Sequence, residues 1–232
     1  MKRLVGGLLA CMLVAGTAFA AEAEKGVVDK DKTGYGYGYF SGRQMKQMGL
    51  DVPVEKLLQG IRDGYTGQKS AMTDEEIKQA LDGLQKELMA KRAEEMKKIG
   101  EKNKKEGEAF LAENKKKEGV VTTASGLQYK VMTAGTGKQP TEADSVKVHY
   151  RGTLLDGTEF DSSIKRGQPA TFALKGIIPG WQEVLKLMKP GDKWLVFVPS
   201  SLAYGERGAP PMIGPNQTLT FEIELLEVVS QK

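Results

Sequence analysis

The 232-residue sequence contains one histidine, His149, and one cysteine, Cys11. A zinc site needs three or four closely placed protein ligands, mostly His and Cys, so the sequence predicts no metal centre. The formal net charge of +4 at pH 7 is small, and no long basic segment accompanies it, which argues against nucleic-acid binding. No motif points to a cofactor. We therefore expect a protein that works without a metal or a cofactor and without nucleic acid.

Motifs for hydrolysis and nucleotide binding are missing as well. The sequence 161–163 places an acid beside two serines, but strand alternation turns His149 to the face opposite Tyr150, away from the core. A Ser-His-Asp relay needs an inward histidine, and no G-x-S-x-G elbow is present. Residues 133–138 partly match a phosphate-binding loop, but Met132 replaces its first glycine. Serine hydrolysis and nucleotide chemistry are both disfavoured.

Residues 1–20 have the pattern of a cleaved export signal. Two basic residues precede an apolar run, residues 4–14, and residues 18–20 read Ala-Phe-Ala, the small-x-small pattern of a cleavage site. The run is too short to remain as a membrane span. Cleavage would remove Cys11, and a chain without thiols tolerates an oxidising compartment. In the alternative interpretation, residues 8–11 are a lipoprotein cleavage box and Cys11 carries a lipid.

Residues 27–70 are expected to form a small helical dimerisation domain. Apolar residues at helical spacing predict helices over 37–48 and 54–65, with a break at Pro53. About forty residues bury too little apolar surface to be stable alone, so a second copy of the chain is the expected partner. Close packing at the glycines of the Tyr-Gly repeat, residues 35–39, is preferred to a ligand-binding role.

Residues 73–118 predict a single long connecting helix. It opens with the capping box Thr73-Asp74-Glu75-Glu76 and would extend about 67 Å at ~1.5 Å per residue. Apolar residues become sparse in its second half, so that half is expected to stand in water. Gly100 and Gly107 weaken a helix and are expected to mark bends. The segment would then be a rigid spacer.

Residues 119–232 predict a compact β-rich domain, because every proline except Pro53 and both tryptophans lie there. Residues 146–151 and 218–225 alternate between apolar and polar, which is typical of strands with one buried face. Asp156-Gly157 predicts a hairpin, and Pro190-Gly191 predicts a type II turn. Only residues 181–188 favour a helix. The fold class is therefore α+β, with a bent antiparallel sheet wrapped on one short helix.

Four motifs in this domain resemble the FKBP-type peptidyl-prolyl cis-trans isomerases. They occur in family order between about residues 120 and 229: VHYRGTLLDGTEFDSS (148–163), GIIPGWQEVLKLMKPGDK (176–193), LAYGERG (202–208) and IGPNQTLTFEIELLEV (213–228). The signal, small helical domain and long helix resemble the macrophage infectivity potentiator-like branch of exported bacterial FKBPs. This resemblance implies a periplasmic location, with association to the outer membrane as an option.

The resemblance also implies a pocket with Trp181 as its floor. In the family pattern the Ile178 backbone N–H and the Tyr204 hydroxyl bind carbonyls of the bound chain, while Asp161 faces the proline-side carbonyl. Tyr150, Asp161, Tyr204 and Phe221 are the implied catalytic residues; Phe160, Arg166, Phe172, Ile177, Ile178, Trp181 and Ile213 are the implied substrate-binding residues. Ala170, Ala209 and Met212 depart from well-known members, which affects expected inhibitor affinity and substrate preference.

The implied activity is acceleration of X-Pro rotation in proline-containing unfolded or nascent exported polypeptides, together with a folding-chaperone role. The implied assembly is a homodimer, and macrolides are the inhibitor class of the family. A different class of function stays open: a dimeric holdase that binds unfolded chains with little catalysis. A third possibility, a macrolide-binding or host-directed surface protein, is implied by the family resemblance but by no particular residue of this sequence.

Overall fold

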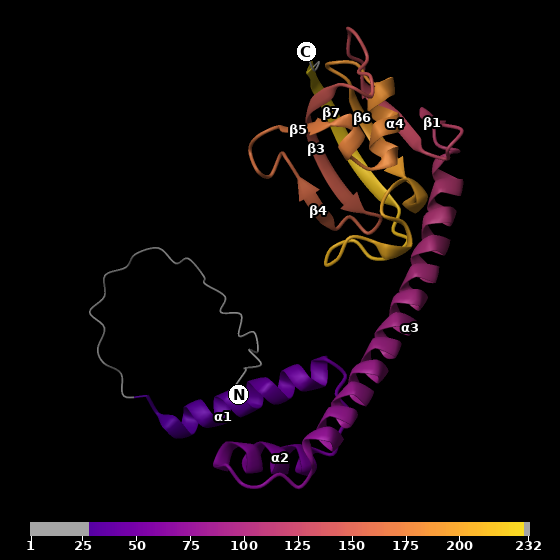
Figure 1. Cartoon of the computed structure of the whole chain (residues 1–232). Helices are drawn as coiled ribbons and strands as arrows, with labels where there is room; N and C mark the ends of the chain where they lie inside the picture. Colours follow the sequence, from indigo (N-terminus) through magenta and orange to yellow (C-terminus); the bar gives the residue numbers. More distant parts are fainter. Residues whose placement is uncertain (1–27, 230–232) are drawn as a thin grey trace, which may run out of the picture. The chain divides into compact units, whose positions relative to one another are not determined.

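The computed structural model describes residues 28–229 (Figure 1). The expected export signal and Cys11 lie outside these residues. The chain divides into two units, Met1–Ser70 and Ala71–Lys232, and each is described by itself below. None of the helices between residues 28 and 229 combines the length and apolar character that crossing a membrane requires.

The first unit contains two helices, α1 (Lys30–Gln47) and α2 (Val54–Thr66). The prediction for α2 is confirmed to within one residue, whereas α1 begins seven residues earlier than expected. Its start is set by Asp29, whose side chain accepts a hydrogen bond from the Lys32 backbone N–H at 3.0 Å. This N-cap overrides the low helix propensity of the glycines that follow it.

Neither α1 nor α2 contains a buried residue. Large apolar side chains stand exposed, among them Tyr37, Ile61 and Tyr65. Several of them border a mostly apolar cavity of about 820 Å³ between the two helices. Outside α1 itself, nothing among residues 28–229 lies within 4 Å of a Cβ placed on Gly36 or Gly38, so these residues do not provide the expected close packing at the two glycines.

The second unit begins with α3 (Asp74–Asn114), an unbroken helix of 41 residues. The capping box is confirmed: Thr73 Oγ1 accepts from the Glu76 backbone N–H at 3.3 Å, and a Glu76 carboxylate oxygen accepts from the Thr73 N–H at 2.8 Å. Ion pairs four residues apart, such as Lys91 with Glu87, line its exposed side. At ~1.5 Å per residue the helix is about 62 Å long.

The expectation that the second half of α3 stands in water holds for most of its residues but is wrong for one face. Gly100, Gly107 and Asn114 are buried, and their spacing of seven residues places them on one face of the helix. The Phe110 ring packs on Phe197 with 5.5 Å between centroids. The two glycines do not interrupt the helix. They are contact points, because their missing side chains let the helix approach the β-domain closely.

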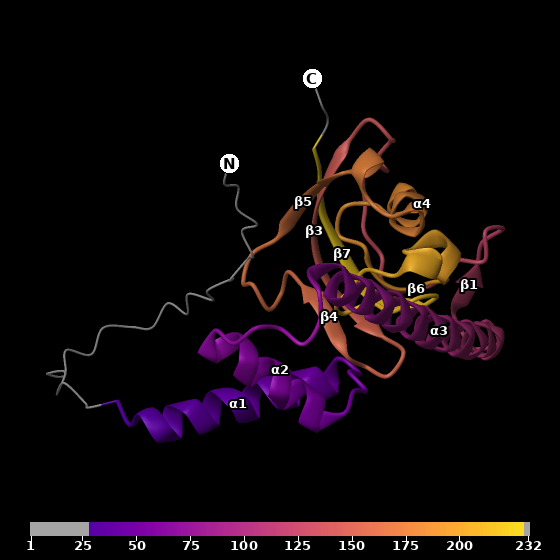
Figure 2. The same cartoon turned by 60° about the horizontal axis from the view of Figure 1, so that its bottom comes forward.

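The rest of the second unit is one antiparallel sheet in the order β1-β2-β6-β7-β3-β4, with β5 paired to β3 (Figure 2). Alternating burial along β3 and β7 confirms the predicted strands. The strands are β1 (Val120–Thr122), β2 (Gln128–Thr133), β3 (Ser145–Leu154), β4 (Glu159–Ser162), β5 (Ala170–Ala173), β6 (Lys193–Val198) and β7 (Leu219–Val229); short 3-10 helices are η1 (Leu174–Gly176), η2 (Ser200–Leu202) and η3 (Gly205–Arg207).

The helix α4 (Pro179–Leu187) lies against the inner face of this sheet (Figure 2). Gly180 permits the contact, since a Cβ there would lie 2.5 Å from Val198 Cγ1. Both predicted turns are confirmed: Gly157 and Gly191 have φ of 85° and 89°, which L side chains rarely adopt. The core between α4 and the sheet positions the cavity described next.

Candidate active site

Aromatic rings form the floor and walls of a cavity between α4 and the sheet. The Trp181 ring meets three others edge-on, with centroid distances of 5.2 Å to Tyr150, 5.6 Å to Phe172 and 5.2 Å to Phe221. Phe160 in turn meets Phe221 edge-on at 5.6 Å. Edge-to-face contacts of this kind fix ring orientation as well as burying apolar surface. The cavity measures about 260 Å³, just below the ~300–1,000 Å³ usual for drug-sized ligands.

Gly152 on β3 is what allows the rings to close over the sheet. A Cβ at this position would lie 2.6 Å from Phe160 and 2.9 Å from Phe221. Gly152 pairs with Phe221 across β3 and β7 and with Asp161 across β3 and β4. The glycine of the Y-R-G motif is therefore needed for space, because its φ is not in the left-handed range.

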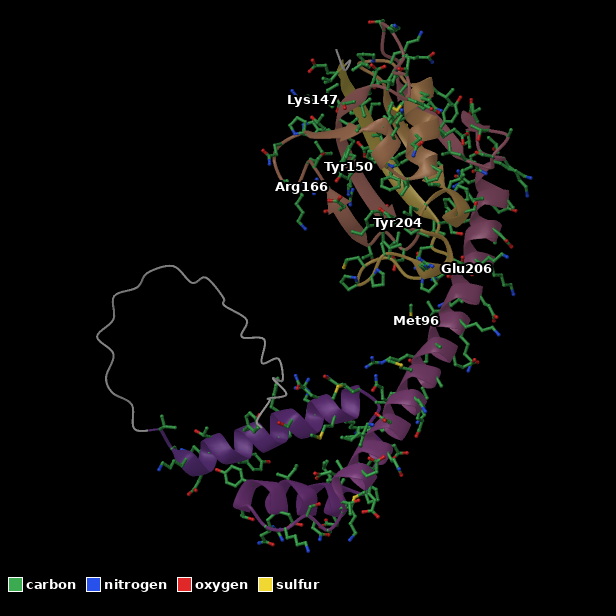
Figure 3. All side chains as sticks on the ribbon, in the orientation of Figure 1. Met96, Lys147, Tyr150, Arg166, Tyr204 and Glu206 are labelled. Atoms are coloured by element: carbon green, nitrogen blue, oxygen red, sulfur yellow. The ribbon has the colours of Figure 1, made fainter. Side chains whose placement is uncertain are left out.

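The polar side of the cavity is a linked set of three side chains, Tyr150, Asp161 and Arg166. The Tyr150 hydroxyl donates to one Asp161 carboxylate oxygen, and Arg166 forms an ion pair with the other. A second guanidinium nitrogen of Arg166 donates to the Tyr150 oxygen at 2.9 Å. Figure 3 shows Tyr150 and Arg166 on neighbouring elements of the domain. Asp161 is thus held from two sides.

The environment keeps this set in one protonation state near neutral pH. Burial raises the pKa of Asp161, but hydrogen bonds from Tyr150 and Arg166 outweigh it and leave that pKa below its ordinary value. Burial, and then the hydrogen bond to Asp161, raises the pKa of Tyr150. Burial and the Asp161 charge raise the pKa of Tyr204. The carboxylate is charged and both phenols are neutral.

The remaining wall comes from the segment that enters α4 and from the connection after β6. Ile178 is the N-cap residue of α4, and Pro179 occupies the first helical position. Gln182 steadies this entry, because its side-chain amide donates to the Ile177 carbonyl at 2.7 Å. Tyr204 is 41% exposed and lies at the edge of the cavity. Its hydroxyl can therefore be reached from solvent.

All but two of the residues implied by the sequence line this cavity: Tyr150, Phe160, Asp161, Phe172, Ile177, Ile178, Trp181, Tyr204 and Phe221. Arg166 reaches it only through Asp161 and Tyr150. Ile213 is buried in the core, outside the cavity lining, so its substrate contact stays a prediction. Sequence reasoning missed Gly176, which also lines the wall; its place at the start of the G-I-I-P-G-W motif was the available signal.

His149 does not take part in this cavity. Its Nδ1 lies 3.1 Å from Ser163 Oγ, so a serine and the histidine do meet. Ser163 is fully buried, however, and Asp161 is bound to Tyr150 and Arg166 instead. Within residues 28–229, no three His, Cys, Asp or Glu side chains are arranged to hold a metal ion.

Two family models match the chain. Residues 136–226 match the FKBP-type peptidyl-prolyl cis-trans isomerase domain, and residues 30–131 match the domain amino-terminal to it. The chain is 48% identical to the outer membrane protein MIP of Legionella longbeachae over 217 residues, covering 93% of each protein.

The chain belongs to the FKBP-type peptidyl-prolyl cis-trans isomerases.

Two further FKBP relatives extend this likeness over the helical part. The peptidyl-prolyl cis-trans isomerase Mip of Coxiella burnetii is 45% identical over 98% of this chain and 99% of its own length. The crystal structure of FkpA from Escherichia coli matches with a TM-score of 0.72 at 38% identity, covering 87% of this chain and 97% of that one. This FKBP is therefore a peptidyl-prolyl cis-trans isomerase with a long connecting helix and an amino-terminal helical domain.

Proposed function

We propose that the aromatic cavity is the place where this isomerase binds a prolyl ring and lets the preceding peptide bond rotate. The observation that carries the proposal is Trp181, enclosed by three edge-on rings at the bottom of the cavity with Asp161 at its polar side. Such a cavity offers apolar contact to the ring and only a few polar groups to the flanking backbone. That combination suits a prolyl residue within a peptide.

The energy required is modest. Rotation about a peptide bond faces a barrier of roughly 18–20 kcal/mol because twisting destroys amide resonance. An X-Pro bond consequently isomerises in about 10–100 s. Reaching milliseconds needs four to five decades, or about 5.5–7 kcal/mol at ~1.4 kcal/mol per decade. Because no bond is broken, neither a nucleophile nor a general base nor a metal is required.

The cavity lowers the barrier by binding the twisted amide better than the planar one. A twisted amide has less charge separation, so surroundings of Trp181, Phe160 and Phe221 that exclude water disfavour the planar state more. The rings also hold the proline in one orientation while the preceding residue turns. The catalysis thus comes from differential binding of the transition state.

The polar groups fix the chain on either side of the rotating bond. The Tyr204 hydroxyl, neutral and reachable, can donate to a substrate carbonyl. The backbone N–H of Ile178, at the start of α4, is placed on the wall for a second carbonyl. Asp161 supplies a fixed negative charge beside the proline-side carbonyl carbon, and Tyr150 and Arg166 keep that charge in place.

The substrates in this proposal are proline-containing unfolded polypeptides exported to the periplasm, where the enzyme also acts as a folding chaperone. The export-signal pattern of residues 1–20, and relatives that include a protein named for the outer membrane, support this location. Association with the outer membrane is part of the same proposal, while lipid attachment at Cys11 remains the alternative route to it. Macrolides are proposed as inhibitors through the same aromatic cavity.

We further propose that residues 27–70 form a homodimer base. Helices α1 and α2 bury no residue within one chain; Tyr37 and Ile61 stay exposed beside an apolar cavity, and Tyr65 is exposed as well. A second copy of the same surface would cover these side chains by a closed two-fold contact. Residues 73–118 and 119–232 then serve as connecting helix and isomerase domain.

A refolding assay tests the proposal. The slow, proline-limited refolding phase of a model protein should accelerate on addition of the full-length protein. A panel of peptides that differ only in the residue before proline measures the preference at the same time. A folded sample that accelerates neither reaction would contradict the proposal.

The alternative function is a holdase, because the exposed apolar side chains of α1 and α2 could bind unfolded chains without catalysis. Aggregation of an unfolded protein is measured with the wild type and with a Tyr204→Ala variant. If suppression of aggregation survives the loss of isomerase activity, chain binding is separate from the cavity. If both fall together, the chaperone effect depends on the cavity.

A further inference from the structure

The segment that joins β6 to β7, residues 199–218, contacts the cavity on one side and α3 on the other. Tyr204 lines the cavity, whereas Glu206 borders a groove whose other wall includes Met96 of α3. Figure 3 shows Tyr204 between Tyr150 on one side and Glu206 and Met96 on the other. The connecting helix and the site residue are therefore separated by a single loop.

Three contacts fasten this loop to α3. The Asn103 side chain donates to the Pro215 carbonyl at 2.8 Å, and the Asn216 side chain donates to the Gly100 carbonyl at 3.4 Å. At Gly107 a Cβ would lie 2.2 Å from Thr218 Oγ1, so a larger residue must shift the Thr218 side chain, the loop or the helix. Thr218 and Pro215 are both buried. The contact is tight along two turns of α3.

Asn216 transmits this contact toward Tyr204. While its side chain bonds to α3, its backbone N–H donates to the carbonyl of Gly205 at 2.8 Å, next to Tyr204 in the chain. Asn216 has φ of 54°, a left-handed conformation that an asparagine tolerates better than most residues. One residue thus joins the helix to the backbone that carries the site tyrosine.

The loop has little regular structure of its own to hold it. It contains the one-turn helices η2 and η3 and a single isolated bridge between Ala209 and Ile213. Loops with few ladder hydrogen bonds open more easily than strands. The position of the Tyr204 hydroxyl consequently depends on what the loop is fastened to.

We propose that the second half of α3 is a positioning element of the isomerase site, with Asn103 and Gly107 as positioning residues that act through Tyr204. The inference rests on the proposed role of Tyr204 in binding substrate. A shift of about 1 Å in a group that orients substrate can cost on the order of a hundredfold in rate. The helix thereby contributes to catalysis as well as to spacing.

The first test substitutes Gly107→Ala in the full-length protein and measures kcat/KM on an X-Pro peptide. The matched control is Gly83→Ala on the same helix, where nothing lies within 4 Å of the added Cβ. We expect the Gly107 variant to lose about tenfold in kcat/KM, well within the cost of a ~1 Å displacement, and the control to match the wild type. Equal activity of both folded variants would overturn the proposal.

The second test removes only one hydrogen bond between α3 and the loop. It serves if the Gly107→Ala variant does not fold. Asn103→Ala is made in the wild type and in a Tyr204→Ala background. We expect about a fivefold loss of kcat/KM in the wild type, the factor corresponding to one neutral hydrogen bond. In the Tyr204→Ala background we expect no further loss, because coupled positions are not additive.

The outcomes separate the inference from the function on which it rests. If Tyr204→Ala lowers kcat/KM but Asn103→Ala costs nothing, α3 does not position the site and only the inference fails. If Asn103→Ala lowers kcat/KM by the same factor in the wild type and in the Tyr204→Ala background, the helix acts by a route other than Tyr204. The inference again fails. If Tyr204→Ala leaves activity intact, the proposed role of Tyr204 fails, and the inference with it.

Discussion

Replacing Tyr150 by phenylalanine removes one oxygen atom and tests the polar side of the cavity. The ring would keep its packing against Phe172 and Trp181, because Tyr150 is only 5% exposed. The lost hydroxyl bonds to both Asp161 and Arg166. Without it, Arg166 is the one side chain of the set that still binds Asp161, and this surface ion pair holds the carboxylate less well.

The magnitude follows from the exposure of the partners. Hydrogen bonds to charged groups contribute roughly 1.5–3 kcal/mol when buried. The side chains of Asp161 and Arg166 are 43% and 46% exposed, so water replaces part of the loss. We expect a stability decrease of about 1 kcal/mol. A comparable loss of transition-state binding, ~1.4 kcal/mol, would lower kcat/KM about tenfold.

The assay pairs kcat/KM on an X-Pro peptide with thermal unfolding. Tyr129→Phe is the matched control, since Tyr129 lies in the same sheet and stacks on Trp194 at 4.4 Å, outside the cavity lining. The control should retain wild-type activity. If Tyr150→Phe is as active as Tyr129→Phe, the linked polar set has no part in catalysis and the reasoning is refuted.

Three further predictions concern pH, space and assembly. Because the pKa of Asp161 is lowered in the folded state, its contribution to stability is present above the unfolded pKa of ~3.9 and is lost as the pH falls through the folded pKa. Since the pKa values of Tyr150 and Tyr204 are raised, kcat/KM should be level from about pH 6 to 9, and a bell-shaped profile would contradict this. Gly152→Ala should push the Phe160 ring out of place, costing about 1–3 kcal/mol of stability and most of the activity. Unchanged stability and unchanged activity would show that the cavity accepts a methyl group here and would contradict the prediction. Ile61→Glu should convert the dimer to monomers in sedimentation while Gln59→Glu should not; dimers in both would remove the proposed base.

Much of the fold could be predicted because its signals are local. The Thr73 capping box, the alternation along 146–151 and the glycines at the two tight turns each specify structure within a few residues. The residues of the aromatic cavity could not be predicted from local signals. Residues 150, 160, 181 and 221 meet only through the sheet register and α4, so a resemblance to known motifs placed them together where spacing alone could not.

The second half of α3 shows what the sequence could not reveal. Its scarcity of apolar residues predicted that it stands in water, but Gly100, Gly107 and Asn114, together with Phe110, pack one of its faces on the β-domain. Asn103 and Pro215 are 112 positions apart in the chain, and no local pattern pairs them. The low helix propensity of Gly107 predicts a bend, whereas the structure shows that its missing side chain leaves room for Thr218.

The most direct test of the central claim compares catalysed X-Pro exchange in H₂O and in D₂O. The claim is that an apolar, Trp181-floored cavity promotes rotation of an imide bond with no proton transferred and no covalent bond made. We predict strong acceleration of exchange by the full-length protein, with the same kcat/KM in both solvents. No acceleration, or a clearly slower reaction in D₂O, would contradict the account.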